Sequence, residues 1–220
     1  MSAPVDLLST AYGDLSAVLS SLTVEEGFEP TGCAGWTPVD LGFHLLSDAR
    51  RALVALHTPA AGPADTTAVD YWTAWRPPEP GDEEELWSTR VAASVHGGLR
   101  GIAARYSETS AAAVVAAGRA DPDGLVGTQG RVLTAPDFLS TLVVEAAVHH
   151  LDLVVRLDRP GPAAAPLAEV RRVLGGLLGA PLPPSWDDVT AARRGTGREP
   201  LTADDRAELG EHASAFPLFG

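Results

Sequence analysis

The sequence contains no lysine and no asparagine, so all 16 of its positively charged residues are arginine. Without lysine the protein cannot form a Schiff base with a carbonyl substrate, and it cannot supply the lysine of a P-loop. Without asparagine it has no acceptor for N-linked glycosylation. These two absences exclude three kinds of chemistry.

Cysteine is also nearly absent, because Cys33 is the only one in the 220 residues. One cysteine excludes a disulfide within the chain, a C-x-x-C redox pair and a cysteine-rich zinc module. No apolar run reaches the ~18 residues of a membrane span. Residues 1–25 contain Asp6 and Asp14 and lack a basic start, unlike a secretory signal. We therefore expect a cytoplasmic protein that does not bind membranes.

Acidic residues outnumber basic ones by 29 to 16, which gives a formal net charge of −13. Binding to nucleic acid needs a basic face that neutralises phosphates, so this balance argues against nucleic acid as a partner. We expect the partners to be small molecules, and a homodimer stays open.

Apolar residues recur at helical spacing along most of the chain. In the first segment they are Leu7, Leu8, Tyr12, Leu15, Val18, Leu19 and Leu22. Thr37 can cap a second helix, because Pro38 suits the first helical position and Asp40 completes a capping box. We predict main helices over 5–26, 38–56, 82–117 and 134–157, shorter helices over 167–178 and 202–213, and no strand. Gly97, Gly98 and Gly101 interrupt the stretch over 82–117 and indicate either a break or a close helix crossing.

The predicted fold is mainly α, with four antiparallel helices in a bundle and a short, mostly helical C-terminal extension. The composition changes after Arg159-Pro160, where residues 161–166 are rich in Ala, Pro and Gly, as in a linker. We therefore predict two domains, over 1–160 and 161–220.

The fourth predicted helix carries a narrow polar stripe on an otherwise apolar surface. At about 100° per residue, five polar side chains fall close to one line: Thr141, Glu145, His149, Asp152 and Arg156. Two interpretations stay open. The stripe faces water, or it faces the bundle interior, where a carboxylate needs a cation, a hydrogen-bonding partner or a metal ion.

His44 lies in the middle of the second predicted helix, and its neighbours at helical spacing include Asp48 and Arg51. Two helices with polar stripes are most simply explained if the stripes face each other. His44, Glu145 and His149 would then form a two-histidine, one-carboxylate set with open coordination positions, as in catalytic zinc and non-haem iron(II) sites. Asp48 and Asp152, each one turn from a histidine, can hydrogen-bond to an imidazole.

Two motifs in the sequence resemble a known family. Residues 33–45 read CAGWTPVDLGFHL, and residues 145–153 read EAAVHHLDL. They resemble the C-x-G-W-[ST]-x-x-D-x-x-x-H and E-x-x-x-H-x-x-D elements of the mycothiol-dependent maleylpyruvate isomerase family, a branch of the DinB-like metal-binding bundles. An arginine-only, alanine-rich chain is also consistent with the actinobacteria that make mycothiol.

The resemblance implies a DinB-like four-helix bundle that holds a divalent ion, usually zinc, through His44, Glu145 and His149. It also implies mycothiol as a cosubstrate. The predicted function is that of a thiol S-transferase or a cis–trans isomerase acting on an electrophilic small molecule. A metal-binding bundle without catalysis, serving as a sensor or partner-binding module, and a metal-dependent hydrolase stay open as alternatives.

The substrate does not follow from the motifs. The family's isomerases carry a second α/β domain, and the short tail here shows no strands for one. Among the arginines that can bind a substrate carboxylate we single out Arg51 and Arg198, the latter in a basic segment over 193–198 that suits an anion. Three tryptophans can line a pocket: Trp72, Trp75 and Trp87.

Overall fold

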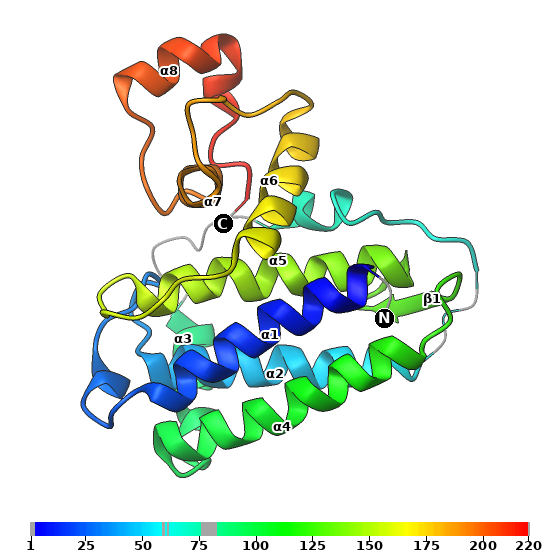
Figure 1. The fold of residues 1–220 in the computed structure, drawn as a ribbon, viewed down its shortest axis with the longest axis vertical. Coiled ribbons are helices and arrows are strands. Elements are labelled where there is room, and N and C mark those ends of the chain that lie inside the picture. The colour runs from blue at the N-terminus through cyan, green and yellow to red at the C-terminus, as the bar shows by residue number, and fades with distance from the viewer. Residues whose placement is uncertain (1–2, 59, 61, 76–82, 220) are drawn as a thin grey trace.

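The computed structural model describes residues 3–58, 60, 62–75 and 83–219 and shows a bundle of long helices (Figure 1). The bundle consists of α1 (Ala3–Ser21), α2 (Pro38–Leu56), α4 (Gly98–Arg119) and α5 (Ala135–Val154). Helices α1 and α2 each pack against both α4 and α5. The predicted mainly α, DinB-like fold is therefore confirmed.

The four helices do not alternate in direction as predicted. Helices α1 and α5 run one way along the bundle, whereas α2 and α4 run the other way (Figure 1). Between α2 and α4 lie the 3-10 helix η2 (Asp70–Ala74) and α3 (Glu83–Ser94), which bring the chain back to the end where α2 began. A long crossover of this kind leaves consecutive bundle helices parallel.

The stretch predicted over 82–117 forms two helices, so of the two interpretations of its glycines the break is correct. Helix α3 ends at Ser94, and α4 follows a break in which Gly97 and Gly98 have φ angles of 77° and 68°. Residues with a Cβ atom rarely adopt such angles. The predicted start at Asp82 lies outside the described residues. The first helix ends earlier than predicted, at Ser21, and the 3-10 helix η1 (Glu26–Phe28) follows it.

A β-hairpin forms where no strand was expected, so that prediction is wrong. Strand β1 (Leu125–Thr128) pairs antiparallel with β2 (Arg131–Thr134). The two residues that join them, Gln129 and Gly130, have φ angles of 49° and 75°, which suit a tight hairpin turn. Each strand has only four residues, too few for a clear alternation of polar and apolar side chains.

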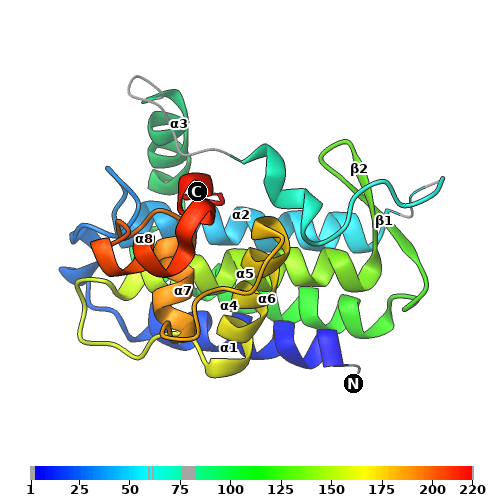
Figure 2. The ribbon, with the colours of Figure 1, turned by 90° about the horizontal axis from the view of Figure 1, so that it is seen from above.

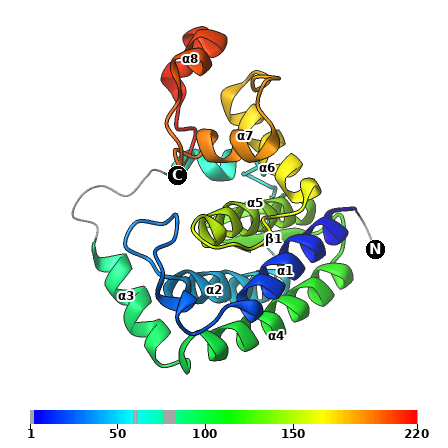
Figure 3. The ribbon, with the colours of Figure 1, turned by 60° about the vertical axis from the view of Figure 1, so that its left-hand side comes forward.

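The C-terminal extension is helical, as predicted, and packs on the α5 side of the bundle (Figures 2 and 3). It contains α6 (Ala164–Leu178), α7 (Asp188–Gly195), α8 (Ala203–Leu209) and the 3-10 helix η3 (Gly210–Ala215). Helix α7 falls where the sequence analysis expects none. Helix α6 packs against α5, and its apolar side chains join the bundle core. The domain boundary at 160 stays a prediction.

Helix α5 lies between the rest of the bundle and the extension (Figure 3). Most of its residues are buried, and Glu145 of the polar stripe meets His44 of α2. Of the two interpretations of that stripe, the interior one is therefore correct for Glu145 and His149, while Arg156 is exposed. Within the described part of the chain, no helix is long and apolar enough to cross a bilayer.

The start of α2 provides a test of the fold. The Thr37 side chain accepts a hydrogen bond from the Asp40 N–H, and the Asp40 carboxylate accepts one from the Thr37 N–H. We expect Thr37→Ala to lower the free energy of unfolding by about 1 kcal/mol, because the cap is lost. Thr37→Ser keeps the hydroxyl and should unfold close to the wild type. Urea unfolding measures both, and equal losses in the two variants would contradict this role of the hydroxyl.

Candidate metal centre

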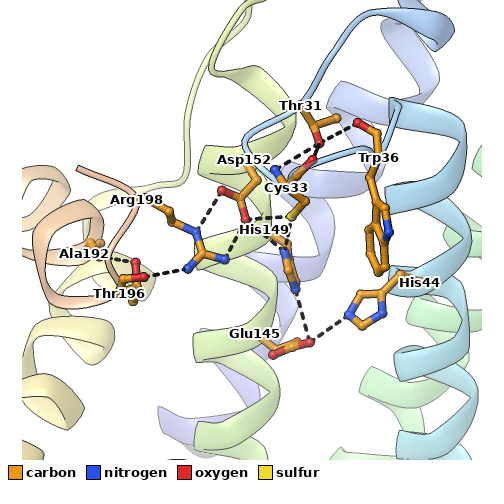
Figure 4. A network of polar contacts seen from close by, with 10 residues as sticks. All are labelled: Thr31, Cys33, Trp36, His44, Glu145, His149, Asp152, Ala192, Thr196 and Arg198. Atoms are coloured by element: carbon orange, nitrogen blue, oxygen red, sulfur yellow. Dashed lines mark hydrogen bonds and ion pairs between the residues drawn. The ribbon is translucent and has the colours of Figure 1, made fainter. Parts of the chain in front are cut away.

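Helices α2 and α5 bring the three predicted ligand residues together (Figure 4). The Nε2 atom of His44 lies 2.9 Å from Oε1 of Glu145, and the Nε2 atom of His149 lies 3.3 Å from the same oxygen. One donor atom from each of the three residues lies within 4.8 Å of the others. This spacing allows a single ion to reach all three.

The loop before α2 fixes the position of His44. Thr31 donates its hydroxyl to the backbone oxygen of Trp36, 2.9 Å away, and this closes the loop over residues 31–36. The Trp36 ring then packs on the His44 imidazole, with 5.1 Å between ring centres. The same loop is tied to α5, because the Gly32 N–H donates to the backbone oxygen of Asp152 at 2.9 Å.

The two predicted supporting carboxylates have different positions. Asp152 contacts an imidazole, since its Oδ2 lies 3.0 Å from Nδ1 of His149. Asp48 instead forms an ion pair with Arg51, 3.8 Å away, and lines the cavity beside the centre. The Nδ1 atom of His149, which faces away from Glu145, therefore has Asp152 as its hydrogen-bonding partner.

The charges at the centre favour a cation between the two helices. Burial acts to raise the pKa of Glu145, but the charge and hydrogen bonds of the two histidines outweigh it and hold this pKa well below its usual value. Burial acts to lower the pKa of His149, yet the negative charge of Glu145 and the hydrogen bond to Asp152 raise it well above its usual value. The negative charge of Glu145 therefore stabilises a positive charge beside it.

A cavity of about 110 Å³ adjoins the centre. His44 and Glu145 lie at its wall together with Asp48, and among the described residues that line it Arg51 is the only arginine. Further lining residues are Tyr71, Trp72, Trp75, Thr128, Phe138, Thr141 and Leu142. Trp87 does not line it and is 56% exposed on α3.

The aromatic wall of the cavity is held from two directions. The Tyr71 hydroxyl donates to the Gln129 side chain at the hairpin turn, 2.5 Å away. Phe219 from the end of the extension stacks on Trp72, with 4.5 Å between ring centres. The hairpin and the extension therefore shape this cavity, and neither contact follows from the sequence patterns.

Two residues complete the surroundings of His149. The Cys33 thiol donates to Oδ2 of Asp152 at 3.3 Å and lies 3.6 Å from Nδ1 of His149. Arg198 forms an ion pair with Asp152, and Nε lies 2.8 Å from Oδ1. The guanidinium of Arg198 thus contacts Asp152, whereas Arg51 lines the cavity. The substrate-binding role of both arginines stays a prediction.

Comparison with protein families shows to which family the chain belongs. The family model described as the mycothiol maleylpyruvate isomerase N-terminal domain matches residues 8–154. The chain belongs to this family. The family match covers more than half of the chain and includes His44, Glu145 and His149, but it ends before the extension that carries Arg198. No curated protein and no solved structure matches the chain.

Membership of the mycothiol maleylpyruvate isomerase N-terminal domain family confirms the resemblance stated from the two motifs. It indicates a mycothiol-related, metal-binding DinB-like protein, and the three convergent side chains provide a place for the metal. The identity of the ion and the reaction belong to the proposal below.

Gly32 tests how tightly the loop and α5 must meet. A Cβ atom on Gly32 would lie 2.4 Å from Oδ1 and 2.9 Å from Cα of Asp152. We expect Gly32→Ala to lower the thermal unfolding temperature, because the loop must move away from α5. Gly13→Ala is the matched control, since a Cβ there meets nothing within 4 Å and alanine favours a helix over glycine by about 1 kcal/mol. A stable Gly32→Ala variant would contradict the close contact.

The raised pKa of Asp48 leads us to expect that the stability of the protein depends on pH. Burial, with the charge of Glu145, raises the pKa of Asp48 from 3.8 to about 6 despite Arg51. The folded state therefore holds the proton more tightly than the unfolded chain, and stability is lost as the pH rises through about 6. At about pH 7.5 the ionised carboxylate costs about 3 kcal/mol.

We expect Asp48→Asn to stabilise the chelator-treated protein at about pH 7.5 and to have little effect at about pH 4. Asp65→Asn is a control in which the change in stability should have the opposite sign. The hydrogen bond from the Val132 N–H lowers the pKa of that exposed carboxylate, so the ionised form is the favoured one there. Chemical denaturation at the two pH values measures both. An Asp48→Asn gain that does not change with pH would refute the assignment.

Proposed function

We propose that this protein is a divalent-metal-dependent enzyme that uses mycothiol, a low-molecular-weight thiol, as the nucleophile toward an electrophilic small molecule. The reaction is either S-transfer or cis–trans isomerisation. The observation that carries the proposal is the meeting of His44, Glu145 and His149, two of which, His44 and Glu145, line a cavity. A reduced cytoplasm is the compartment in which such a thiol is available.

The donor set fits a zinc ion. Two imidazole nitrogens and one carboxylate oxygen are ligands that zinc accepts, and three protein ligands leave a position for a substrate or a thiol. The Nδ1 atom of His149 faces Asp152, which leaves Nε2 for the ion. When bound by these three residues, a divalent cation would supply a positive charge that lowers the pKa of a nearby thiol and so would favour the nucleophilic thiolate.

The remaining steps belong to side chains of the cavity. Arg51 lines the cavity and can bind a carboxylate of the substrate, while Trp72 and Trp75 give the cavity an apolar wall. Asp48 lines the same cavity and can accept the thiol proton, since its pKa is raised to about 6. Together these residues orient an electrophile with its reactive carbon toward the ligand set.

The electron balance is the same for both reactions up to the first adduct. The thiolate sulfur forms a bond to one alkene carbon, and the π electrons move onto the conjugated carbonyl group of the substrate. Rotation about the former double bond, followed by cleavage of the carbon–sulfur bond, regenerates the thiolate and the isomerised alkene. Protonation of the adduct at carbon instead gives the S-conjugate.

The test combines metal content with thiol chemistry. We expect the purified protein to bind about one divalent ion per chain, to bind mycothiol only when metal is present, and to conjugate or isomerise activated alkenes with it. His44→Ala should weaken metal binding at least ~100-fold, as loss of a ligand exceeds the usual effect of a supporting residue. His57→Ala is the control, because His57 lies at the exposed end of α2.

Each alternative predicts a different result. Consumption of the electrophile without the thiol would indicate a hydrolase, and metal binding with no turnover and no thiol binding would indicate a binding module. Protein that retains no divalent ion after purification in metal-replete medium would refute the proposal.

A further inference from the structure

Arg198 reaches from the extension to the metal centre, although it lies outside the family match. Two parallel bonds join it to Asp152, with Nε and Nη2 each 2.8 Å from a carboxylate oxygen (Figure 4). Its third nitrogen, Nη1, donates to the backbone oxygen of Thr196 at 3.3 Å. The guanidinium is therefore fixed in position by α5 on one side and by its own loop on the other.

The carboxylate that Arg198 contacts is enclosed. The Asp152 side chain is only 2% exposed, and ionising such a group without a partner costs several kcal/mol. Arg198 supplies that partner with two hydrogen bonds, one to each carboxylate oxygen. A carboxylate held in this way accepts the hydrogen bond from the imidazole of His149 at a fixed place.

The same carboxylate orients His149. With Oδ2 accepting from Nδ1 of His149, the imidazole presents Nε2 to Glu145 and His44. A hydrogen bond of this kind fixes both the ring rotation and the tautomer of a metal-binding histidine. A continuous series of contacts therefore runs from Arg198 through Asp152 and His149 to Glu145.

A second donor cluster lies on the far side of the His149 ring. Cys33 Sγ, His149 Nδ1 and Asp152 Oδ2 lie within 4.8 Å of one another, as ligands of a metal ion would. The guanidinium of Arg198 already supplies a positive charge there, in contact with both oxygens of Asp152. A metal ion in this cluster would have to compete with that charge.

We propose that Arg198 is the resident cation of this second cluster and a positioning residue for the metal centre, which it serves by holding Asp152 and, through it, His149 with Nε2 toward the ion. The role in metal binding rests on the function proposed above. The orientation of His149 does not, because it can be observed without metal.

The main variant is Arg198→Met, which keeps a long side chain and removes the charge. The control is Arg193→Met, because Arg193 pairs with Glu199 inside the extension, 2.9 Å away, and both variants lose one ion pair. Zinc affinity is measured by competition with a chelator. We expect Arg198→Met to bind zinc ~10–100-fold more weakly, Arg193→Met to match the wild type, and Arg198→Lys to lie between them.

Nitrogen-15 spectra of the imidazoles provide a readout that loss of stability alone does not change. In the wild type, with and without zinc, we expect a protected His149 Nδ1–H resonance from the bond to Asp152, and we expect it to disappear in Arg198→Met. An unchanged resonance and unchanged zinc affinity in that variant would overturn the proposal and leave Arg198 as an anchor of the extension. If Arg198→Met does not fold, the Arg198→Lys variant decides the question. A zinc affinity and a His149 resonance equal to those of the wild type in Arg198→Lys would overturn the positioning by two parallel bonds.

Cobalt tests the claim that the second cluster is already occupied by Arg198. We expect the wild type to take up cobalt without a thiolate-to-cobalt charge-transfer band. Such a band, absent from Cys33→Ser, would show that an ion displaces Arg198, and would overturn the proposal. Wild-type protein that binds neither zinc nor cobalt would contradict the proposed function, while the spectra of the metal-free variants would still decide the orientation of His149.

Discussion

The carboxylate of Glu145, held between two imidazoles inside a helical bundle, sets the requirements for the rest of the site. A charge in that position is costly unless it is paired. Here His44 and His149 pair it from two helices. Two further buried carboxylates have cationic partners of their own, Asp48 with Arg51 and Asp152 with Arg198. Helices α2 and α5 must therefore face each other in one register for His44 to reach Glu145.

Patterns within single helices predict the ligand set because they depend on neighbours three or four residues apart. The spacing of Glu145 and His149 and the polar neighbours of His44 place both stripes without any tertiary information. The capping box at Thr37 likewise fixes the start of α2. The hairpin is different, because β1 and β2 are too short for alternation to appear, and their main signal is the turn at Gln129 and Gly130.

Contacts between distant segments are what the sequence does not reveal. The bond from Arg198 to Asp152 spans 46 residues, and its geometry depends on α7, which the hydrophobic pattern does not predict. The cavity wall shows the same limit. Trp72 lines the cavity and Trp87 does not, and nothing in their local sequence separates them. The helix directions follow from the path of the connection after α2, which propensities do not describe.

The hydrogen bond from Cys33 to Asp152 bears on self-alkylation. An enzyme that brings electrophiles to a thiolate exposes its own cysteine to the same reagents, and this cysteine lies 3.6 Å from a candidate metal ligand. The thiolate is the reactive form of cysteine, whereas Cys33 donates its hydrogen to a carboxylate that is already negative. A reagent that alkylates Cys33 would therefore have to break this hydrogen bond, and it would place its adduct beside His149.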